Sequence, residues 1–141
     1  NKAPIIYGDG EQKRCFSYID DCISCLMPML DQKNLNKQII NIGPDEEFVT
    51  VNKIAEICSN VTGNNLKPIY TKDRPREVKH ATCSADKARK LLNYKTKTSL
   101  QNGILETFRY IKKRGIRPFE YYINLEIKND LTPDTWLKKE I

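Results

Sequence analysis

Apolar and polar residues follow two periods along this chain, and together these periods predict short strands alternating with amphipathic helices. The expected strands cover residues 3–7, 14–18, 38–42 and 67–70. The run at 38–42 is rich in isoleucine and ends at Gly43, which predicts a buried strand. In the 14–18 segment, alternation is expected to place Phe16 and Tyr18 on the same strand face as Arg14.

Helical spacing with one apolar face occurs at about residues 20–30, 51–62, 85–92 and 100–114. Residues typical of helix ends flank these stretches: Thr50, Ser84 and either Thr98 or Ser99 as N-caps, with Gly63 and Gly115 as terminators. After Pro118 the pattern fades. We therefore divide the chain into a lobe of residues 1–118 and a tail of residues 119–141 that wraps over a surface, and the lobe is expected to be α/β.

The composition suits a single soluble core, with 141 residues and a hydrophobic fraction of 39%. No apolar run approaches the roughly 18 residues that a membrane span needs. The five cysteines are odd in number and lie largely in apolar-periodic segments, which favours reduced thiols in a cytoplasmic protein. Because the chain begins with Asn1 and not with Met, we expect it to be part of a longer protein.

Positive charge is concentrated in one stretch of the chain. The net charge is +6, and residues 66–90 hold eight Lys or Arg against three acids. A basic stretch attracts polyanions in general, so a nucleic-acid-binding module remains an alternative, although no nucleic-acid motif accompanies it. A zinc site on Cys22-x-x-Cys25 and His80-x-x-Cys83 is a further alternative. We expect no metal, because Cys22 and Cys25 fall inside a predicted helix, where Cys packs as a small apolar residue.

Arg14 and Arg74 each lie in a short motif suited to binding phosphate. Arg14 follows the turn Gly8-Asp9-Gly10, and Arg74 opens the sequence Arg-Pro-Arg-Glu that ends at Glu77. A guanidinium is planar, permanently charged and matched to two phosphate oxygens at once. Two of them, brought together from positions 60 residues apart, would hold a diphosphate without a metal ion.

These motifs, in this order, resemble those of the NAD-dependent nucleotide-sugar epimerases and dehydratases. This family belongs to the extended short-chain dehydrogenase/reductase superfamily, and UDP-glucose 4-epimerase is its best-known member. Residues 6–21 are similar to the family's VYGDG…RxFxYxxD segment, residues 41–43 to its N-[LI]-G strand end, and residues 74–77 to its RxG[DE] motif. Two further signatures match residues 84–94 and 98–103. The resemblance covers most of the chain between residues 4 and 113.

The resemblance implies the C-terminal, substrate-binding portion of such an enzyme. Its fold would be α/β, helices with short strands, some of which would complete the sheet of a main Rossmann domain that this chain lacks. Tyr7 would stack beside the uracil, Arg14 and Arg74 would contact the diphosphate, and Glu77 would accept a hydrogen bond from a ribose hydroxyl. The residues expected to position the strand and helix start behind Arg14 are Phe16, Tyr18 and Asp21.

The sequence also departs from the family pattern. Arg76 stands where the family usually has Gly, and Asn93 replaces the Gly before Tyr94. The third glycine of a dinucleotide turn is missing after Gly8-Asp9-Gly10, and no tyrosine has Lys four residues later. We therefore expect the NAD site and the catalytic base in a preceding segment. No catalytic, cofactor-binding or metal-binding residue is expected in this chain.

The sequence thus predicts binding of the nucleoside-diphosphate part of a nucleotide sugar, in the C-terminal part of an NAD-dependent sugar-nucleotide 4-epimerase. A related dehydratase or decarboxylase is the first alternative, and the nucleic-acid-binding module is the second. The expected partners are a UDP-sugar or other nucleotide sugar and the missing N-terminal Rossmann domain, with no membrane. Self-association into a homodimer stays open. NAD is expected in the full-length protein and not on this chain alone.

Overall fold

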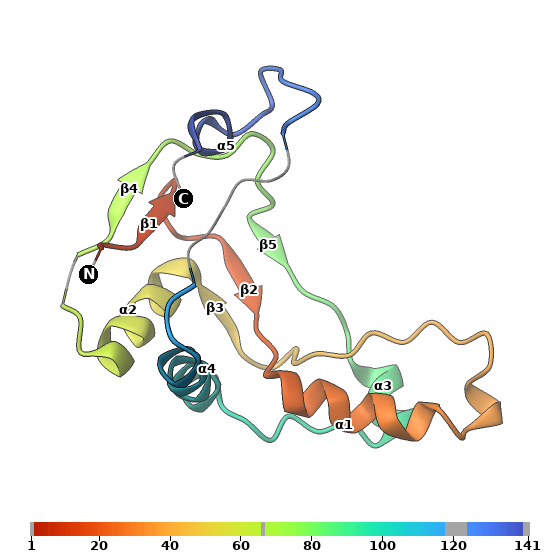
Figure 1. Ribbon diagram of the computed structural model, residues 1–141. Coiled ribbons are helices and arrows are strands. Elements are labelled where there is room, and N and C mark those ends of the chain that lie inside the picture. Colours follow the sequence, from red (N-terminus) through yellow and green to blue (C-terminus); the bar gives the residue numbers. More distant parts are fainter. Residues whose placement is uncertain (1, 66, 118–123, 140–141) are drawn as a thin grey trace.

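The computed structural model describes residues 2–65, 67–117 and 124–139. Its strands form two small sheets (Figure 1). In the first, β1 (Ile5–Tyr7) pairs in parallel with β4 (Ile69–Thr71). In the second, β2 (Lys13–Cys15) lies between antiparallel β3 (Phe48–Thr50) and parallel β5 (His80–Ala81). The mixed α/β class predicted from the sequence is confirmed.

The helices of the described part are α1 (Ile19–Met29), α2 (Val51–Thr62), α3 (Asp86–Leu92), α4 (Leu100–Arg114) and α5 (Asp134–Lys138), with a short 3-10 helix η1 (Lys33–Leu35). Two predicted N-caps are confirmed, because Thr50 accepts a hydrogen bond from the Lys53 N–H and Ser99 accepts one from the Asn102 N–H. Gly63 ends α2 at φ 67°, in the left-handed region that favours glycine. Helix α3 begins at Asp86, with Ala85 as its N-cap, so Ser84 is not the cap.

A small apolar core joins α1 to α3. Its buried members are Cys25, Leu35, Ala85, Ala88, Leu92 and Tyr94. Asn93 ends α3 at φ 52°, which Asn tolerates better than most residues. The buried Cys25 packs here as a small apolar residue, in agreement with the interpretation made from the sequence.

Asp21, near the start of α1, fixes the segment that leads into α4. Its side chain is 4% exposed. One oxygen accepts hydrogen bonds from the backbone N–H groups of Lys97 (3.0 Å) and Thr98 (2.9 Å), and the other accepts one from the Thr98 hydroxyl (3.2 Å). Asp21 therefore ties together two segments that are more than 70 residues apart. The resemblance implied that it positions the strand and the helix start behind Arg14, and it did not imply this link to the segment before α4.

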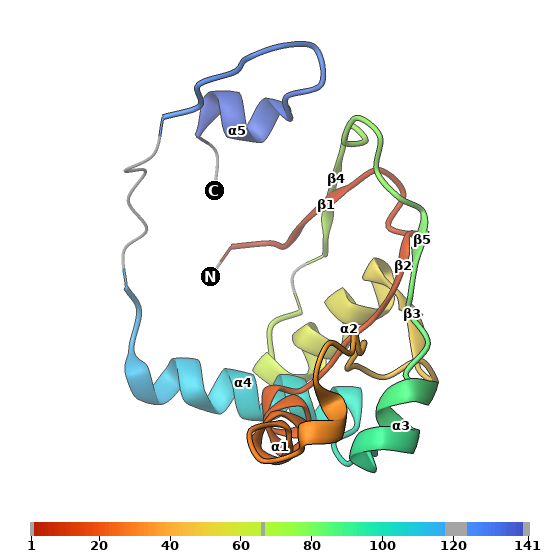
Figure 2. The same cartoon turned by 90° about the vertical axis from the view of Figure 1, so that its right-hand side faces the viewer.

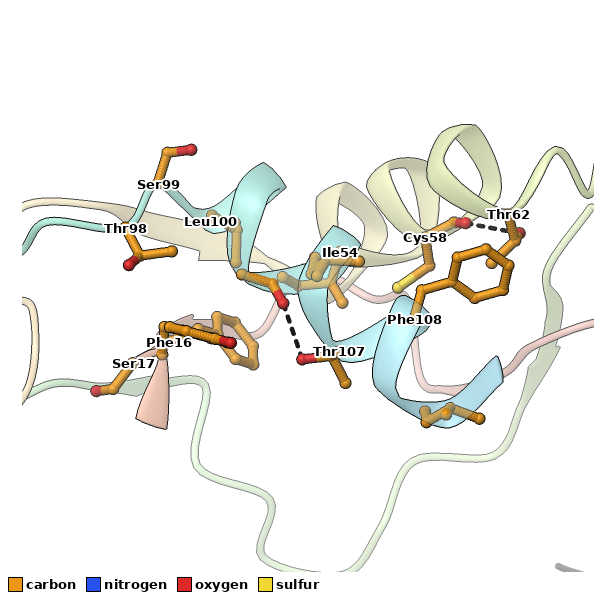
Figure 3. Close-up of a pocket in the computed structure, with 14 residues that line it drawn as sticks. Phe16, Ser17, Ile54, Cys58, Thr62, Thr98, Ser99, Leu100, Thr107 and Phe108 are labelled. Atoms are coloured by element: carbon orange, nitrogen blue, oxygen red, sulfur yellow. Dashed lines mark hydrogen bonds between the residues drawn. The ribbon is translucent and has the colours of Figure 1, made fainter. Parts of the chain in front are cut away.

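Helices α2 and α4 face each other across an apolar cavity of about 330 Å³ (Figure 3). Helix α2 contributes Ile54 and Cys58, and α4 contributes Phe108 among others. Phe16 and Tyr18 also line this cavity, while Arg14 lines a different one. The prediction that these three side chains share a strand face is therefore wrong, since β2 ends at Cys15 and the alternation ends with it.

The predicted strand at residues 38–42 is also wrong. No residue in this segment is assigned to a strand, and Ile39 is 86% exposed. Ile40 and Ile42 pack against the core between α1 and α3 instead. A strand requires a ladder partner for its backbone groups, and no described segment pairs with this one.

Helix α1 presents an apolar face that the described residues leave uncovered. Its exposed members are Ile19, Ile23, Leu26, Met27 and Leu30. They recur at intervals of three and four residues, so they lie along one side of the helix. This surface is named the α1 stripe below.

The tail is described only in part. The sequence from residue 124 leads to α5, in which Thr135 is buried. Figure 2 shows α5 facing the β1/β4 pair. The tail aromatics Phe119, Tyr121 and Tyr122 lie outside the described residues. Among the described helices, none has the length and apolar character to cross a membrane.

Candidate functional site

The four site residues predicted from the sequence line a single cavity of about 160 Å³. Its full lining is Ile5, Ile6, Tyr7, Gln12, Arg14, Val51, Arg74 and Glu77. We name it the arginine cavity. Two cations and one acid line it, so its charge favours an anionic ligand.

Two parallel strand pairings bring these residues together. The β1/β4 register places Tyr7 opposite Thr71, a few residues before Arg74. The β2/β5 register places Arg14 opposite Ala81, a few residues after Glu77. The loop between β4 and β5 is therefore fixed at both ends, and its two motif residues are held beside the first motif.

The Arg14 guanidinium is partly engaged and partly free. Nη1 donates to the backbone oxygens of Lys13 (2.7 Å) and Lys79 (3.3 Å), and Nη2 donates to Glu77 Oε1 at 2.8 Å. A guanidinium carries five N–H donors. Nε–H and the second Nη2–H meet no acceptor among the described residues, so they can bind an anion while the other three donors keep the fork in place. The sequence did not reveal the Arg14–Glu77 pair.

Arg74 lies over the ring of Tyr7. Its Cζ is 4.1 Å from the ring centroid, a cation–π arrangement. Within the described residues its guanidinium donates no hydrogen bond to a protein acceptor, and Glu77 pairs with Arg14 and not with Arg74. The stacked guanidinium therefore keeps its N–H donors for a ligand in the arginine cavity.

Gln12 is a residue of the site that sequence reasoning missed. It is only 7% exposed and lines the arginine cavity. Its Nε2 donates to the Tyr7 backbone oxygen at 3.1 Å, and its Oε1 meets no donor in the described part of the chain. A buried carbonyl without a partner is costly, so this oxygen is available to accept a hydrogen bond from a water or a ligand. The one signal for Gln12 in the sequence was that it is a polar residue inside the first motif.

Arg76 contributes nothing to the wall of the arginine cavity. Its backbone has φ 55°, in the left-handed region, and its side chain is exposed. This conformation gives a physical reason why the family pattern has Gly here, because Gly adopts it without steric cost.

The Gly8-Asp9-Gly10 turn connects two strands, β1 and β2, with φ values of 69° and 73° at its glycines. A dinucleotide turn connects a strand to a helix N-terminus, where the pyrophosphate binds. The described residues at this turn therefore do not fit an NAD site. Its glycines allow the chain to reverse toward Arg14.

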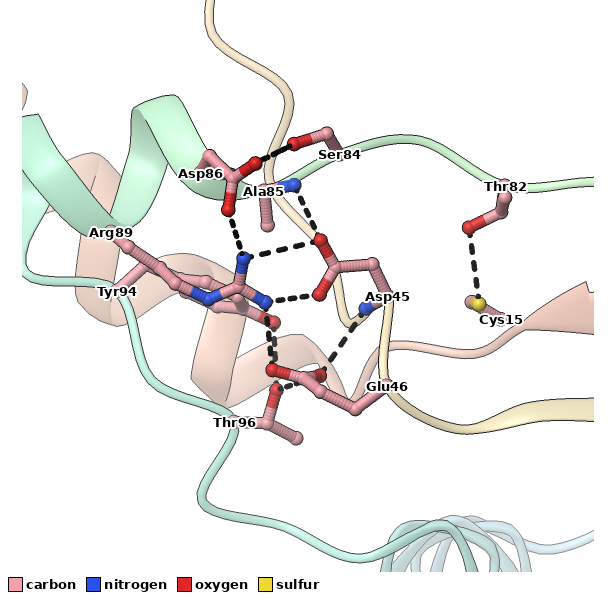
Figure 4. Close-up of polar contacts among 10 residues, drawn as sticks. All are labelled: Cys15, Asp45, Glu46, Thr82, Ser84, Ala85, Asp86, Arg89, Tyr94 and Thr96. Carbon is pink, nitrogen blue, oxygen red and sulfur yellow. Dashed lines mark hydrogen bonds and ion pairs between the residues drawn. The ribbon is translucent and has the colours of Figure 1, made fainter.

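The basic stretch is partly neutralised within the protein (Figure 4). Arg89 donates to both carboxylate oxygens of Asp45, to Glu46 Oε1 at 2.7 Å and to Asp86 Oδ1 at 2.9 Å. Lys87 donates to the Ile39 backbone oxygen at 2.9 Å. Such cations stabilise the fold, which weakens the alternative of a nucleic-acid-binding face. As for zinc, the described ranges hold no group of three His, Cys, Asp or Glu side chains placed to bind a metal ion.

The Arg89 cluster predicts an acid-dependent loss of stability. Hydrogen bonds from Arg89 lower the pKa values of Asp45 and Glu46 below their ordinary values of 3.8 and 4.5. When folding lowers the pKa of a carboxyl group, that group stabilises the fold at pH values above its unfolded-state pKa. This stabilisation is lost as the pH falls through the folded-state pKa. We expect the urea concentration at the midpoint of unfolding to decrease as the pH drops below about 4.5. The midpoint should depend less on pH in Arg89→Gln. The control is Arg109→Gln, which breaks only the exposed pair with Glu106; equal pH profiles for the two variants would refute the assignment.

Comparison with known proteins finds enzymes that act on nucleotide sugars. The family model for GDP-mannose 4,6-dehydratase matches residues 1–107. A UDP-glucuronate 4-epimerase from Thermodesulfobacterium geofontis is 34% identical over 108 residues, which are 77% of this chain and 33% of that protein. A UDP-N-acetyl-alpha-D-glucosaminuronate decarboxylase from Bacillus cytotoxicus is 26% identical, over 77% of this chain and 35% of its own length.

A crystal structure of UDP-glucuronic acid 4-epimerase from Bacillus cereus, in complex with UDP-glucuronic acid and NAD, superimposes with a TM-score of 0.73. It is 34% identical and covers 81% of this chain and 36% of that one. The chain therefore spans about a third of the length of these relatives, and corresponds to their C-terminal portion.

Proposed function

We propose that this chain, a member of the GDP-mannose 4,6-dehydratase family of nucleotide-sugar epimerases and dehydratases, binds the nucleoside diphosphate of a nucleotide sugar in the arginine cavity. The observation that carries the proposal is the convergence of Arg14 and Arg74, both with unused N–H donors, on one cavity. The chemistry of these donors matches the oxygens of a diphosphate.

In this proposal the chain anchors the part of the substrate that does not react. Arg14 is held by Glu77 and two backbone carbonyls, and Arg74 is held by the face of Tyr7. Both guanidinium groups are thus positioned before the ligand arrives, which lowers the entropic cost of binding. Binding energy from the nucleotide can then orient the sugar at a distant catalytic centre.

Titration of UDP into the wild-type chain and into an Arg14→Ala variant tests this function. UDP is the ligand of choice because structural relatives are described in complex with UDP-sugars. The proposal requires saturable binding to the wild type and a large loss in the variant. Equal binding of UDP to both proteins would exclude the arginine cavity as the nucleotide site.

Gln12 is expected to accept a hydrogen bond from a ribose hydroxyl, beside Glu77. Gln12→Met keeps the length of the side chain and removes its polar atoms, so UDP should bind about tenfold more weakly. Binding of 2′,3′-dideoxy-UDP, which lacks both hydroxyl donors, should be equal in the wild type and the variant. Calorimetry with the two nucleotides measures the difference. Comparable losses for both would show that Gln12 acts through the Tyr7 backbone and not through the ribose.

The activity of a whole protein containing this chain is proposed to be 4-epimerisation of a sugar nucleotide. Two of the relatives reported above are 4-epimerases. A decarboxylase among the relatives keeps that reaction, and the related dehydration, as the alternative. NAD would bind to the part of such a protein that this chain does not match, because the Gly8 turn does not fit a dinucleotide.

We infer that this other part covers the α1 stripe, whose five large apolar side chains are otherwise exposed to water.

A further inference from the structure

Residues 130–138, named here the α5 segment, contact the arginine cavity from a distant part of the sequence. The Tyr7 hydroxyl donates a hydrogen bond to Oγ1 of Thr135, across 128 positions. Thr135 is 7% exposed, so this contact is shielded from solvent. The family model ends at residue 107, so the family pattern does not account for the contact.

Tyr7 connects Thr135 to one of the two arginines of the site. Its hydroxyl is bound to Thr135, and its ring carries the guanidinium of Arg74, with Cζ 4.1 Å from the ring centroid. Arg74 lines the arginine cavity together with Arg14. Because a stacked guanidinium follows the orientation of the ring beneath it, the contact made by Thr135 also sets the position of Arg74.

Carboxylates that could compete for Arg74 lie close to it. A second cavity of about 110 Å³, named the α5 cavity, shares Tyr7 and Arg74 with the arginine cavity, and its acidic lining residues are Asp73, Asp130 and Asp134. Among the described residues, Arg74 forms no ion pair with these acids and lies on the Tyr7 ring instead. If the ring turned, these carboxylates would be alternative partners, and a guanidinium paired with one of them has fewer donors left for phosphate.

We propose that Thr135 is a positioning residue that holds Arg74 in place for a diphosphate, acting through Tyr7, so that docking of the α5 segment and binding of the diphosphate stabilise each other. The proposal rests on the nucleotide-binding function of the arginine cavity. Linkage of this kind is reciprocal: the factor by which the docked segment raises affinity for the diphosphate is the factor by which the diphosphate strengthens docking. Inorganic pyrophosphate is therefore a sufficient ligand for the effect.

The affinity of the full chain for pyrophosphate tests one side of this linkage. Thr135→Val removes the hydroxyl and preserves the shape of the side chain. We expect it to weaken pyrophosphate and UDP alike, about three- to tenfold, because the coupling runs through one neutral hydrogen bond. Thr135→Ser retains the hydroxyl and should keep wild-type affinity. Thr132→Val is the matched control, since Thr132 also lines the α5 cavity but its hydroxyl accepts from the Asn129 N–H, and this variant should bind as the wild type does.

Two arginine backgrounds separate positioning of Arg74 from a general loss of structure. In Arg74→Ala, adding Thr135→Val should cause no further loss of affinity, because the group that Thr135 positions is gone. In Arg14→Lys, where Arg74 is intact, the same addition should cause its full loss. Tyr7→Phe removes the hydrogen bond from the other partner and keeps the ring, so it should reproduce the effect of Thr135→Val.

Trp136 reports the other side of the linkage. It follows Thr135 directly, is 46% exposed and is the one tryptophan of the sequence. Saturating pyrophosphate should reduce quenching of its fluorescence by acrylamide in the wild type, and should have no such effect in Thr135→Val.

Three results overturn the role of Thr135: unchanged pyrophosphate affinity in both Thr135→Val and Tyr7→Phe, equal further losses in the two arginine backgrounds, or quenching of Trp136 in the wild type that does not respond to the ligand. The arginine cavity stands in each case if Arg14→Ala still weakens pyrophosphate. A wild-type chain that binds neither pyrophosphate nor UDP overturns both proposals.

Discussion

Replacement of Arg14 by alanine is expected to reduce the affinity for UDP by roughly 100-fold, or about 2.8 kcal/mol. Two N–H donors of Arg14 are free for phosphate, and hydrogen bonds between charged partners are the strongest that a site of this kind offers. The variant also leaves Glu77 without its partner in the arginine cavity, where its negative charge would oppose a diphosphate. Isothermal titration calorimetry with UDP measures the loss.

Two further variants separate geometry from charge. Arg14→Lys keeps the charge but not the planar fork, so it should recover only part of the affinity. Arg76→Gly removes an arginine that belongs to the same loop but does not line the arginine cavity. It also relieves the strain of the left-handed backbone conformation at this position. UDP binding should therefore be unchanged in Arg76→Gly. If this control loses as much affinity as Arg14→Ala, the loop acts through its net charge and the clamp is wrong.

Replacement of Asp21 by alanine is expected to lower the free energy of unfolding by about 3 kcal/mol, a large part of the stability of a chain of this size. Its buried carboxylate accepts three hydrogen bonds, and without it the backbone N–H groups of Lys97 and Thr98 lose their acceptor. The start of α4 should loosen first, because the segment before it is tied to α1 by this residue. Urea denaturation measures the change, and hydrogen exchange at residues 97–100 locates it.

Asp20 is the matched control for Asp21. It lies in the same first turn of α1, is exposed and makes none of these contacts. Asp20→Ala loses only an interaction with the helix dipole, so a change of about 0.5 kcal/mol is expected. Similar destabilisation by the two substitutions would mean that the hydrogen bonds of Asp21 contribute little.

The local elements were predictable because their signals are local. Thr50 and Ser99 cap the helices that follow them, and Gly63 ends α2 in the left-handed region. The strand expected at residues 38–42 failed for the opposite reason, since an apolar run becomes a strand only where a partner supplies a ladder. Likewise β2 stops at Cys15, because its pairing with β5 ends at Arg14 and its pairing with β3 ends at Cys15.

The composition of the arginine cavity was predicted in part. Motif similarity pointed to Tyr7, Arg14, Arg74 and Glu77, and the structure brings all four together, although their roles toward a nucleotide stay predictions. Pairing between distant side chains was not predictable. Spacing along the chain carries no signal for the Arg14–Glu77 ion pair or for the Tyr7–Thr135 hydrogen bond. The burial of Gln12 depends on the whole fold. The local sequence, a polar residue in a charged loop, gives no sign that this side chain is buried.

The crystal structure of this chain with UDP tests the central claim most directly. The account predicts the diphosphate in the arginine cavity, with its oxygens within hydrogen-bond distance of Nε or Nη2 of Arg14 and of the guanidinium of Arg74. A diphosphate bound elsewhere, with no ligand atom in contact with the guanidinium group of Arg14 or Arg74, would contradict the account.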